Sequence, residues 1–374
     1  MNPLFTPFTL GDLELPNRLV MAPLTRGRAG AESIPNDMMA EYYRQRAAAG
    51  LIISEATHIS PQGRGWVGAP GIHNADQVRG WQKVTDAVHA EGGRMFLQLW
   101  HMGRASHPDF HEGDAPPVAP SSIAIRGDHI RTPQGRKPYP VPRALETAEI
   151  PGVVQDYARA TTLAKEAGFD GVEIHGANGY LIDQFLRDGS NQRTDRYGGS
   201  IENRVRFLLE VTDAVVSAWR AERVGLRLSP VSNFNDQTDS NPEALFTYAA
   251  QQLNRFGLAY LHVLEALPGH VLAMPGPRVT PAIRQAFRGP LMVNGGYDAK
   301  LGAQAIERGE TDLIAYGVPF LANPDLVERY RTGAPLNAPD FATFYAAGPE
   351  GYIDYPALEP AFSEHHQPVT QREI

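Results

Sequence analysis

Three side chains that could do chemistry follow one another in a short segment, residues 172–180. A β-branched, apolar run ends there, and it delivers an imidazole (His175), an amide (Asn178) and a phenol (Tyr180) at offsets of 0, 3 and 5. All three groups can donate hydrogen bonds while uncharged. Such donors suit gripping a carbonyl-type oxygen and protonating the neighbouring carbon, whereas they fit a metal site or a hydrolytic triad poorly. The segment therefore predicts an enzyme active site.

The composition of the chain excludes several classes of function. Its 374 residues are 42% hydrophobic, which is enough for one large core or two ordinary domains. The net charge of −8, without any basic run, makes nucleic acid and anionic membranes unexpected partners. The chain has no cysteine. Disulfides, thiol nucleophiles and cysteine-held iron–sulfur clusters are therefore excluded.

The N-terminal residues do not resemble a targeting signal. Residues 1–6 lack the charged-then-apolar pattern of a secretory leader. No apolar stretch approaches the roughly 20 residues that a membrane span needs. We therefore expect a cytoplasmic protein.

Short apolar runs alternate with helical patterns along the whole chain. The predicted strands cover residues 18–24, 51–55, 95–100, 171–175, 225–229, 259–264, 291–294 and 312–317. The predicted helices cover residues 36–49, 76–91, 150–167, 201–219, 242–256, 280–287, 300–308 and 324–331. Strands that are apolar along their length indicate a parallel sheet covered by helices. Eight such units predict a closed (β/α)8 TIM barrel.

The residues beyond the barrel repeat fall in a few places. The largest insertion, residues 101–149, follows the third strand and is rich in proline, glycine and charge. It is too long for an ordinary loop, so we expect an excursion or lid over the active face. We predict one domain over residues 1–358 and a flexible tail over residues 359–374.

In a parallel barrel, the C-terminal ends of the strands converge on one mouth, where enzymes of this fold do their chemistry. The residues predicted to lie there are Thr25, Ala56, Gln98, Trp100, His175, Asn178, Tyr180, Arg227, Gly295, Gly296, Gly317 and Val318. The predicted site therefore rests on several strand ends and not on one motif.

Five motifs in order give the chain a resemblance to a known family. They are Met-Ala-Pro-Leu-Thr-Arg at 21–26, Gln-Leu-Trp-His at 98–101, the 175–180 segment, Asn-Gln-Arg-Thr-Asp-Arg-Tyr-Gly-Gly-Ser at 191–200 and Asn-Pro-Asp-Leu at 323–326. Together they resemble the old yellow enzyme family of flavin-dependent ene-reductases, from residue 17 to residue 356. The lack of cysteine and the use of Thr25 resemble its bacterial reductases for N-ethylmaleimide, other xenobiotics and nitrate esters.

The resemblance implies a bound FMN. Thr25 would bond near flavin O4 and tune N5, Gln98 would address the pyrimidine edge, and Arg227 would stand by N1 and O2. The other residues that the resemblance places against the cofactor are Pro23, Leu24, Ala56 and, for the phosphate, the backbone of Gly295, Gly296, Gly317 and Val318.

The resemblance also implies the reaction. NADPH or NADH would reduce the flavin, and an electron-poor alkene (an enone, maleimide or nitroalkene) or a nitrate ester would then enter the same face, in a ping-pong mechanism. His175 and Asn178 would grip the substrate's activating oxygen, and Tyr180 would supply the proton. The residues expected to shape the pocket wall are Trp66, Trp100, Phe344 and Tyr345.

Two positions depart from the family's common pattern. Relatives often have an arginine phosphate clamp where Val318 stands, so FMN retention should be weaker by the loss of a charge-assisted hydrogen bond. Many relatives have histidine where Asn178 stands. An amide does not titrate, so this contact should depend less on pH.

Several alternatives stay open at this point. The chain could be another FMN barrel dehydrogenase, a flavin redox sensor with incidental turnover, or a flavin-free phosphosugar barrel. Arg227 could belong to a buried salt bridge. His107 and His111 lie near acidic residues, but no metal site is expected there, and the glycine pattern at 63–68 lacks the strand–turn–helix context of a dinucleotide motif. We expect a monomer or a homodimer.

Overall fold

The core of the protein is a ring of eight parallel strands. The computed structural model describes residues 2–358, so the predicted tail at 359–374 lies outside the described residues. The ring strands are β3 (Leu19–Met21), β4 (Leu51–Ile53), β6 (Met95–Trp100), β11 (Gly171–His175), β12 (Val224–Leu228), β13 (Tyr260–Leu264), β14 (Leu291–Asn294) and β15 (Leu313–Tyr316). Each lies within one of the eight predicted strand regions or extends at most one residue beyond it.

Pairing around the ring is complete. Consecutive strands pair in parallel from β11 to β15, β15 pairs with β3, and β3 pairs with β4. Strand β6 pairs both with β4 and with β11, which closes the circle. The predicted TIM barrel is therefore confirmed.

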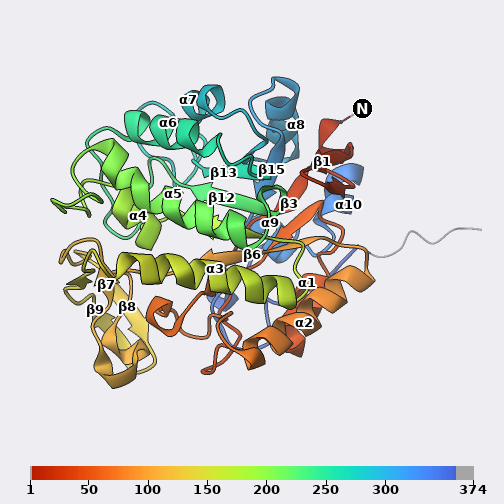
Figure 1. Ribbon diagram of the computed structural model, residues 1–374. Coiled ribbons are helices and arrows are strands. Elements are labelled where there is room, and N and C mark those ends of the chain that lie inside the picture. Colours follow the sequence, from red (N-terminus) through yellow and green to blue (C-terminus); the bar gives the residue numbers. More distant parts are fainter. Residues whose placement is uncertain (1, 359–374) are drawn as a thin grey trace, which may run out of the picture.

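Helices connect the strands and cover the outside of the ring. They are α1 (Asp37–Arg44), α2 (Ala75–Ala90), α3 (Ile150–Glu166), α4 (Leu181–Leu186), α5 (Ile201–Ala218), α6 (Pro242–Leu253), α7 (Thr280–Ala286), α8 (Ala299–Glu307), α9 (Val318–Ala322) and α10 (Leu326–Thr332). Figure 1 shows α3 and α5 crossing in front of the strands. The short helices α4 and α9 were not predicted, because each has fewer than two turns.

A small hairpin closes the N-terminal end of the barrel. Strands β1 (Phe8–Leu10) and β2 (Leu13–Leu15) pair antiparallel around a tight turn at Gly11, which has φ +62°. Leu10 and Leu15 are buried against the inner side chains Val20 and Leu51 of the ring. The hairpin blocks this end of the barrel, so the opposite end is open for the active site.

Two glycines make room for aromatic rings inside the barrel. A Cβ at Gly225 would lie 2.1 Å from the ring of Tyr260, and one at Gly171 would lie 2.4 Å from the ring of Phe96. The two rings stack with centroids 5.9 Å apart. Glycine on two neighbouring strands therefore allows two large rings to fill the space between the β1–β2 hairpin and the mouth.

The excursion after β6 is folded. It contains β7 (Val118–Ala119), the hairpin of β8 (His129–Thr132) with β9 (Gly135–Pro138), and β10 (Arg143–Ala144), which pairs with β7. A two-residue strand, β5 (Thr57–His58), pairs with the end of β6. In Figure 1 the strands β7, β8 and β9 lie on the side of the molecule opposite to β1. The excursion thus belongs to the mouth end, as predicted.

The barrel interior should not tolerate a methyl group at position 225. Gly225→Ala places a Cβ against the Tyr260 ring, so we expect the free energy of unfolding to fall by about 1–3 kcal/mol. The matched control is Gly152→Ala, at an exposed position of α3 where a Cβ meets nothing within 4 Å. This control should stabilise the helix by about 0.5–1 kcal/mol. Urea denaturation measures both values, and equal effects would contradict the packing argument.

Candidate active site

The segment after β11 folds back on itself at the mouth. Asn178 and Gly179 both have left-handed backbone angles, with φ +57° and +70°. A Cβ at Gly179 would lie 2.6 Å from the carbonyl oxygen of Phe234, so glycine is required there, while asparagine tolerates this region of φ. The turn returns Tyr180 to His175, and the two rings meet edge to face with centroids 5.0 Å apart. Imidazole and phenol are therefore neighbours.

Aromatic side chains continue from these two rings across the mouth. Trp100, at the end of β6, lies edge-on to Tyr180 at 4.9 Å, and Trp66 lies 6.5 Å from Trp100. Tyr345, from the last loop, lies 5.3 Å from Trp66. The structure thus brings together three of the four predicted wall residues. The fourth, Phe344, packs instead against Phe341 at 4.9 Å and under the guanidinium of Arg26.

The loop after β12 supports the turn at Asn178. The backbone N–H of Asn178 donates to Ser229 Oγ at 2.7 Å, and its carbonyl accepts from Asn235 Nδ2 at 2.9 Å. Arg104, from the excursion, donates to the carbonyl of Asn235 at 3.1 Å. Asn235 was not predicted as a site residue, although its loop follows directly after the strand that carries Arg227.

The excursion adds two further side chains to the mouth. Ile125 is buried in the same cluster as Trp100 and Tyr180, and Tyr139 packs against this cluster. Neither residue was predicted, because nothing local in the sequence indicates which part of the excursion turns inward.

Burial keeps the reactive side chains uncharged. Burial, reinforced by the positive charge of Arg227, lowers the pKa of His175 well below its usual value of 6.5. Burial also raises the pKa of the Tyr180 hydroxyl well above its usual value of 10, and nearby Tyr139 adds to this effect. At neutral pH the site therefore presents a neutral imidazole and a protonated phenol.

The segment after β3 is fixed by a buried carboxylate. Pro23 is buried, while Leu24 and Thr25 are half-buried, and the following backbone N–H groups of Arg26 and Gly27 both donate to Glu55 at 3.1 Å. Glu55 itself directly precedes buried Ala56, at the end of the neighbouring strand. The predicted cofactor residues of the first two strands are thus brought together.

Two guanidinium groups join this segment to the last loop of the chain. Arg26 donates to the carbonyls of Phe344 at 3.1 Å and Gly351 at 2.8 Å. Arg28 donates to the carbonyls of Thr343 at 3.0 Å and Gly348 at 2.9 Å. The wall residue Tyr345 is therefore carried by a loop that is bonded to the segment bearing Thr25.

Gln98 and Arg227 point into the barrel just below the mouth. Gln98 Nε2 donates to the Glu173 carboxylate at 2.7 Å, and Arg227 Nη2 donates to Asn294 Oδ1 at 2.8 Å. Arg227 Nε is buried and has no partner in the described part of the chain. No carboxylate oxygen among residues 2–358 lies within 4 Å of this guanidinium, so a direct salt bridge does not account for it.

Backbone donors lie at the ends of the last two strands. Gly295 and Gly296 have φ +119° and +83°, in the region that favours glycine. Within residues 2–358, the backbone N–H groups of Gly296 and Val318 donate no hydrogen bond. This is where barrels of this kind commonly bind phosphate. Together with the unpaired donor of Arg227, these groups fit a flavin mononucleotide.

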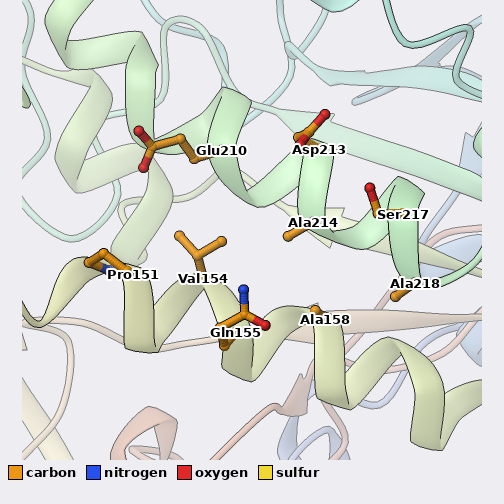
Figure 2. Close-up of a pocket in the computed structure, with 9 residues that line it drawn as sticks. All are labelled: Pro151, Val154, Gln155, Ala158, Glu210, Asp213, Ala214, Ser217 and Ala218. Atoms are coloured by element: carbon orange, nitrogen blue, oxygen red, sulfur yellow. The ribbon is translucent and has the colours of Figure 1, made fainter.

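A hollow on the outside of the barrel has different chemistry. It has a volume of about 530 Å³ and lies between α3 and α5, as Figure 2 shows. Its lining combines small and apolar side chains with Glu210, Asp213 and Gln155, and it includes none of the mouth residues. The mouth therefore remains the candidate site.

The structure bears on a metal site, a dinucleotide motif and a membrane span. The described residues contain no group of three His, Cys, Asp or Glu that could hold a metal, and Asp109 is bonded by Lys137 at 2.9 Å. The glycine pattern at 63–68 follows a short 3₁₀ turn and leads into no helix. Within residues 2–358, no helix is both long and apolar enough to span a membrane.

A closed barrel with this donor set defines a flavin oxidoreductase. A profile of the NADH:flavin oxidoreductase / NADH oxidase family matches residues 3–337, and the chain belongs to this family.

Known relatives match almost the full chain. Morphinone reductase, solved in complex with tetrahydroNAD, is 49% identical with a TM-score of 0.91, covering 97% of this chain and 99% of that chain. The old yellow enzyme homologue from Zymomonas mobilis is 46% identical with a TM-score of 0.93, covering 95% and 99%. A protein of Leishmania infantum named probable flavin mononucleotide-dependent alkene reductase is 47% identical over 356 residues, covering 94% and 96%.

These findings confirm the predicted old yellow enzyme resemblance, the enzyme class, FMN as the cofactor and a nicotinamide as the reductant. They also confirm the prediction of FMN-dependent alkene reduction and give no support to the alternatives. The roles of individual site residues stay predictions.

The buried imidazole at the mouth should not protonate near pH 6.5. Because its pKa is lowered in the folded protein, His175 stays neutral as the pH falls through 6.5, whereas the unfolded chain takes up a proton there. The contribution of His175 to stability therefore falls as the pH drops below about 6.5. Nitrogen NMR of the His175 ring across this pH range measures its protonation. A transition of His175 near pH 6.5 would contradict it.

Proposed function

We propose that this protein reduces the C=C bond of electron-poor alkenes (enones, maleimides and nitroalkenes) and also accepts nitrate esters, with NADH or NADPH as reductant. The observation that carries the proposal is the turn through Asn178 at the barrel mouth, which sets the phenol of Tyr180 against the imidazole of His175. Bound FMN supplies the centre that takes up a hydride and passes it on. The remaining chemistry belongs to the protein's own side chains.

His175 and Asn178 bind and polarise the activating oxygen of the substrate. A neutral imidazole N–H and an amide N–H can both donate to a carbonyl or nitro oxygen, and both bonds strengthen as negative charge grows there. One donor of this kind is typically worth about 2.7–4 kcal/mol in the transition state. The burial of His175 supports this role, since water does not screen the interaction.

Tyr180 holds the proton that the substrate carbon receives. Its raised pKa keeps the phenol protonated at neutral and moderately alkaline pH, as a general acid requires. Its ring lies 5.0 Å from that of His175, so one small substrate can meet both groups. Trp100 and Trp66 exclude water from the same space.

The cofactor is held by groups from separate strand ends. Thr25 and Gln98 address the polar edge of the isoalloxazine, and Arg227 supplies a fixed positive charge beside it. The N–H groups of Gly296 and Val318 bind the phosphate. The other residues assigned to the cofactor are Pro23, Leu24, Ala56, Gly295 and Gly317.

The reductant and the alkene use the same pocket in turn. Trp66, Trp100 and Tyr345 form its wall, while Phe344 positions the loop that carries Tyr345. The excursion residues Ile125 and Tyr139 narrow the substrate range. The structure of morphinone reductase in complex with tetrahydroNAD supports a nicotinamide as the reductant. The cytoplasmic location and the monomeric or dimeric state stay predictions.

Absorption and turnover of the purified protein test the function. We expect a visible flavin spectrum that bleaches on anaerobic addition of NADPH or NADH and recovers on addition of cyclohexenone. A redox sensor would bleach but consume reductant negligibly with the enone. A colourless protein after reconstitution with FMN would exclude the proposal.

Removing the phenol should separate the two half-reactions. In Tyr180→Phe, flavin reduction should stay near the wild-type rate, while alkene reduction should fall by about 10²–10⁴-fold, the usual contribution of a general acid. Stopped-flow absorbance measures each half-reaction. Tyr248→Phe, on the outer helix α6, is the matched control and should change neither. Equal losses in both half-reactions would refute the proton-donor role.

Restoring a cation at the phosphate should slow cofactor release. Val318→Arg adds a charge-assisted hydrogen bond worth about 1.5–3 kcal/mol, so FMN release should slow by one to two orders of magnitude. Flavin fluorescence after dilution measures the rate. Val141→Arg, at an exposed position of the excursion, makes the same exchange away from the site and should leave release unchanged. An unaltered rate in Val318→Arg would contradict the phosphate assignment.

A further inference from the structure

A buried carboxylate lies below the mouth and contacts neither the imidazole nor the phenol of the candidate site. Glu173 lies on β11, two residues before His175, and its side chain is 0% exposed inside the barrel. An isolated ionised carboxylate in such surroundings is strongly unfavourable, so Glu173 requires hydrogen-bond partners or opposite charges nearby.

Two donors, one from the neighbouring strand β6 and one from β13, bind the two oxygens of Glu173. Gln98 Nε2 donates to Oε1 at 2.7 Å, and His262 Nδ1 lies 2.9 Å from Oε2. Gln98 is also the register partner of Glu173 across β6 and β11. Burial raises the pKa of Glu173, but His262, Arg227 and Gln98 outweigh it and leave that pKa below its usual value. The group is therefore a carboxylate at neutral pH.

An ionised carboxylate can only accept hydrogen bonds, which fixes the amide of Gln98. The NH₂ group must face Glu173, so the carbonyl Oε1 is left as an acceptor for the flavin edge. The imide N–H of the flavin's pyrimidine ring is a donor. A free glutamine could turn its amide over and present the wrong group, and Glu173 prevents this.

The same carboxylate balances a charge. The positive charge of Arg227 favours the anionic reduced flavin over the neutral oxidised form. Glu173 is close enough to act on Arg227 electrostatically, although no direct ion pair forms. The negative charge of Glu173 therefore partly offsets the positive charge of Arg227 at the flavin pocket.

We propose that Glu173 is a positioning residue for the cofactor: it orients Gln98 toward the flavin edge and, as counter-charge to Arg227, holds the flavin reduction potential down. This inference rests on the proposed function, since it presumes that FMN occupies the mouth. A lower potential favours hydride delivery to weakly activated alkenes.

The charge is tested by Glu173→Gln, which keeps the shape and removes the anion. In the FMN-loaded protein we expect the ratio of affinities for reduced over oxidised flavin to rise about tenfold, a shift of about +30 mV for a two-electron couple. Equilibration with reference dyes measures the potential. Glu166→Gln, at an exposed position of α3, changes the net charge equally and should leave the potential unaltered. An unshifted potential in Glu173→Gln overturns the counter-charge role.

Orientation is tested by a double-mutant cycle that retains the charge. Glu173→Asp keeps the anion but shortens its reach to Gln98, so FMN should bind severalfold more weakly while the potential stays near that of the wild type. Combined with Gln98→Leu, the two losses of affinity should not add, because they remove one interaction. Additive losses, or a potential shift in Glu173→Asp as large as in Glu173→Gln, overturn the inference.

These readouts are independent of turnover. Absence of alkene reduction in a wild-type protein that binds FMN would refute the proposed substrate, while the potential and the affinity would still decide the role of Glu173.

Discussion

The parallel pairing of β6 with β11 is the contact on which the site depends. These strands are separated in the sequence by the excursion and by α3, yet their register sets Gln98 beside Glu173 and brings Trp100 near His175. The pair also closes the ring. If β11 slipped by one residue, its inward side chains would turn to the helices, and both the donor cluster and the cofactor layer would be lost.

The barrel could be predicted from the sequence because its strands and helices are local patterns. Each strand is a continuous apolar run, and each long helix has its own periodicity. The β1–β2 hairpin was missed, although the alternation around Gly11-Asp12 is a usable hairpin signal. Helix α4 was missed because six residues directly after the active-site turn carry too little periodicity.

Candidate site residues that lie in one segment could be named from the sequence, whereas residues that reach the mouth from distant segments could not. His175, Asn178 and Tyr180 are close in sequence, and in the structure the rings of His175 and Tyr180 pack edge to face. Asn235 and Tyr139 reach the same space only through long-range packing of loops. The partners of Glu173 follow from strand register, which the sequence alone does not specify.

The joining of the first strand's segment to the last loop has a consequence for biosynthesis. Arg26 is bonded to the carbonyl of Gly351, so the wall of the pocket cannot be completed before nearly the whole chain has been translated. A ribosome-bound chain that already contains all eight strands still lacks the loop bearing Tyr345. Enclosure of the cofactor is therefore a late event in the synthesis of the chain.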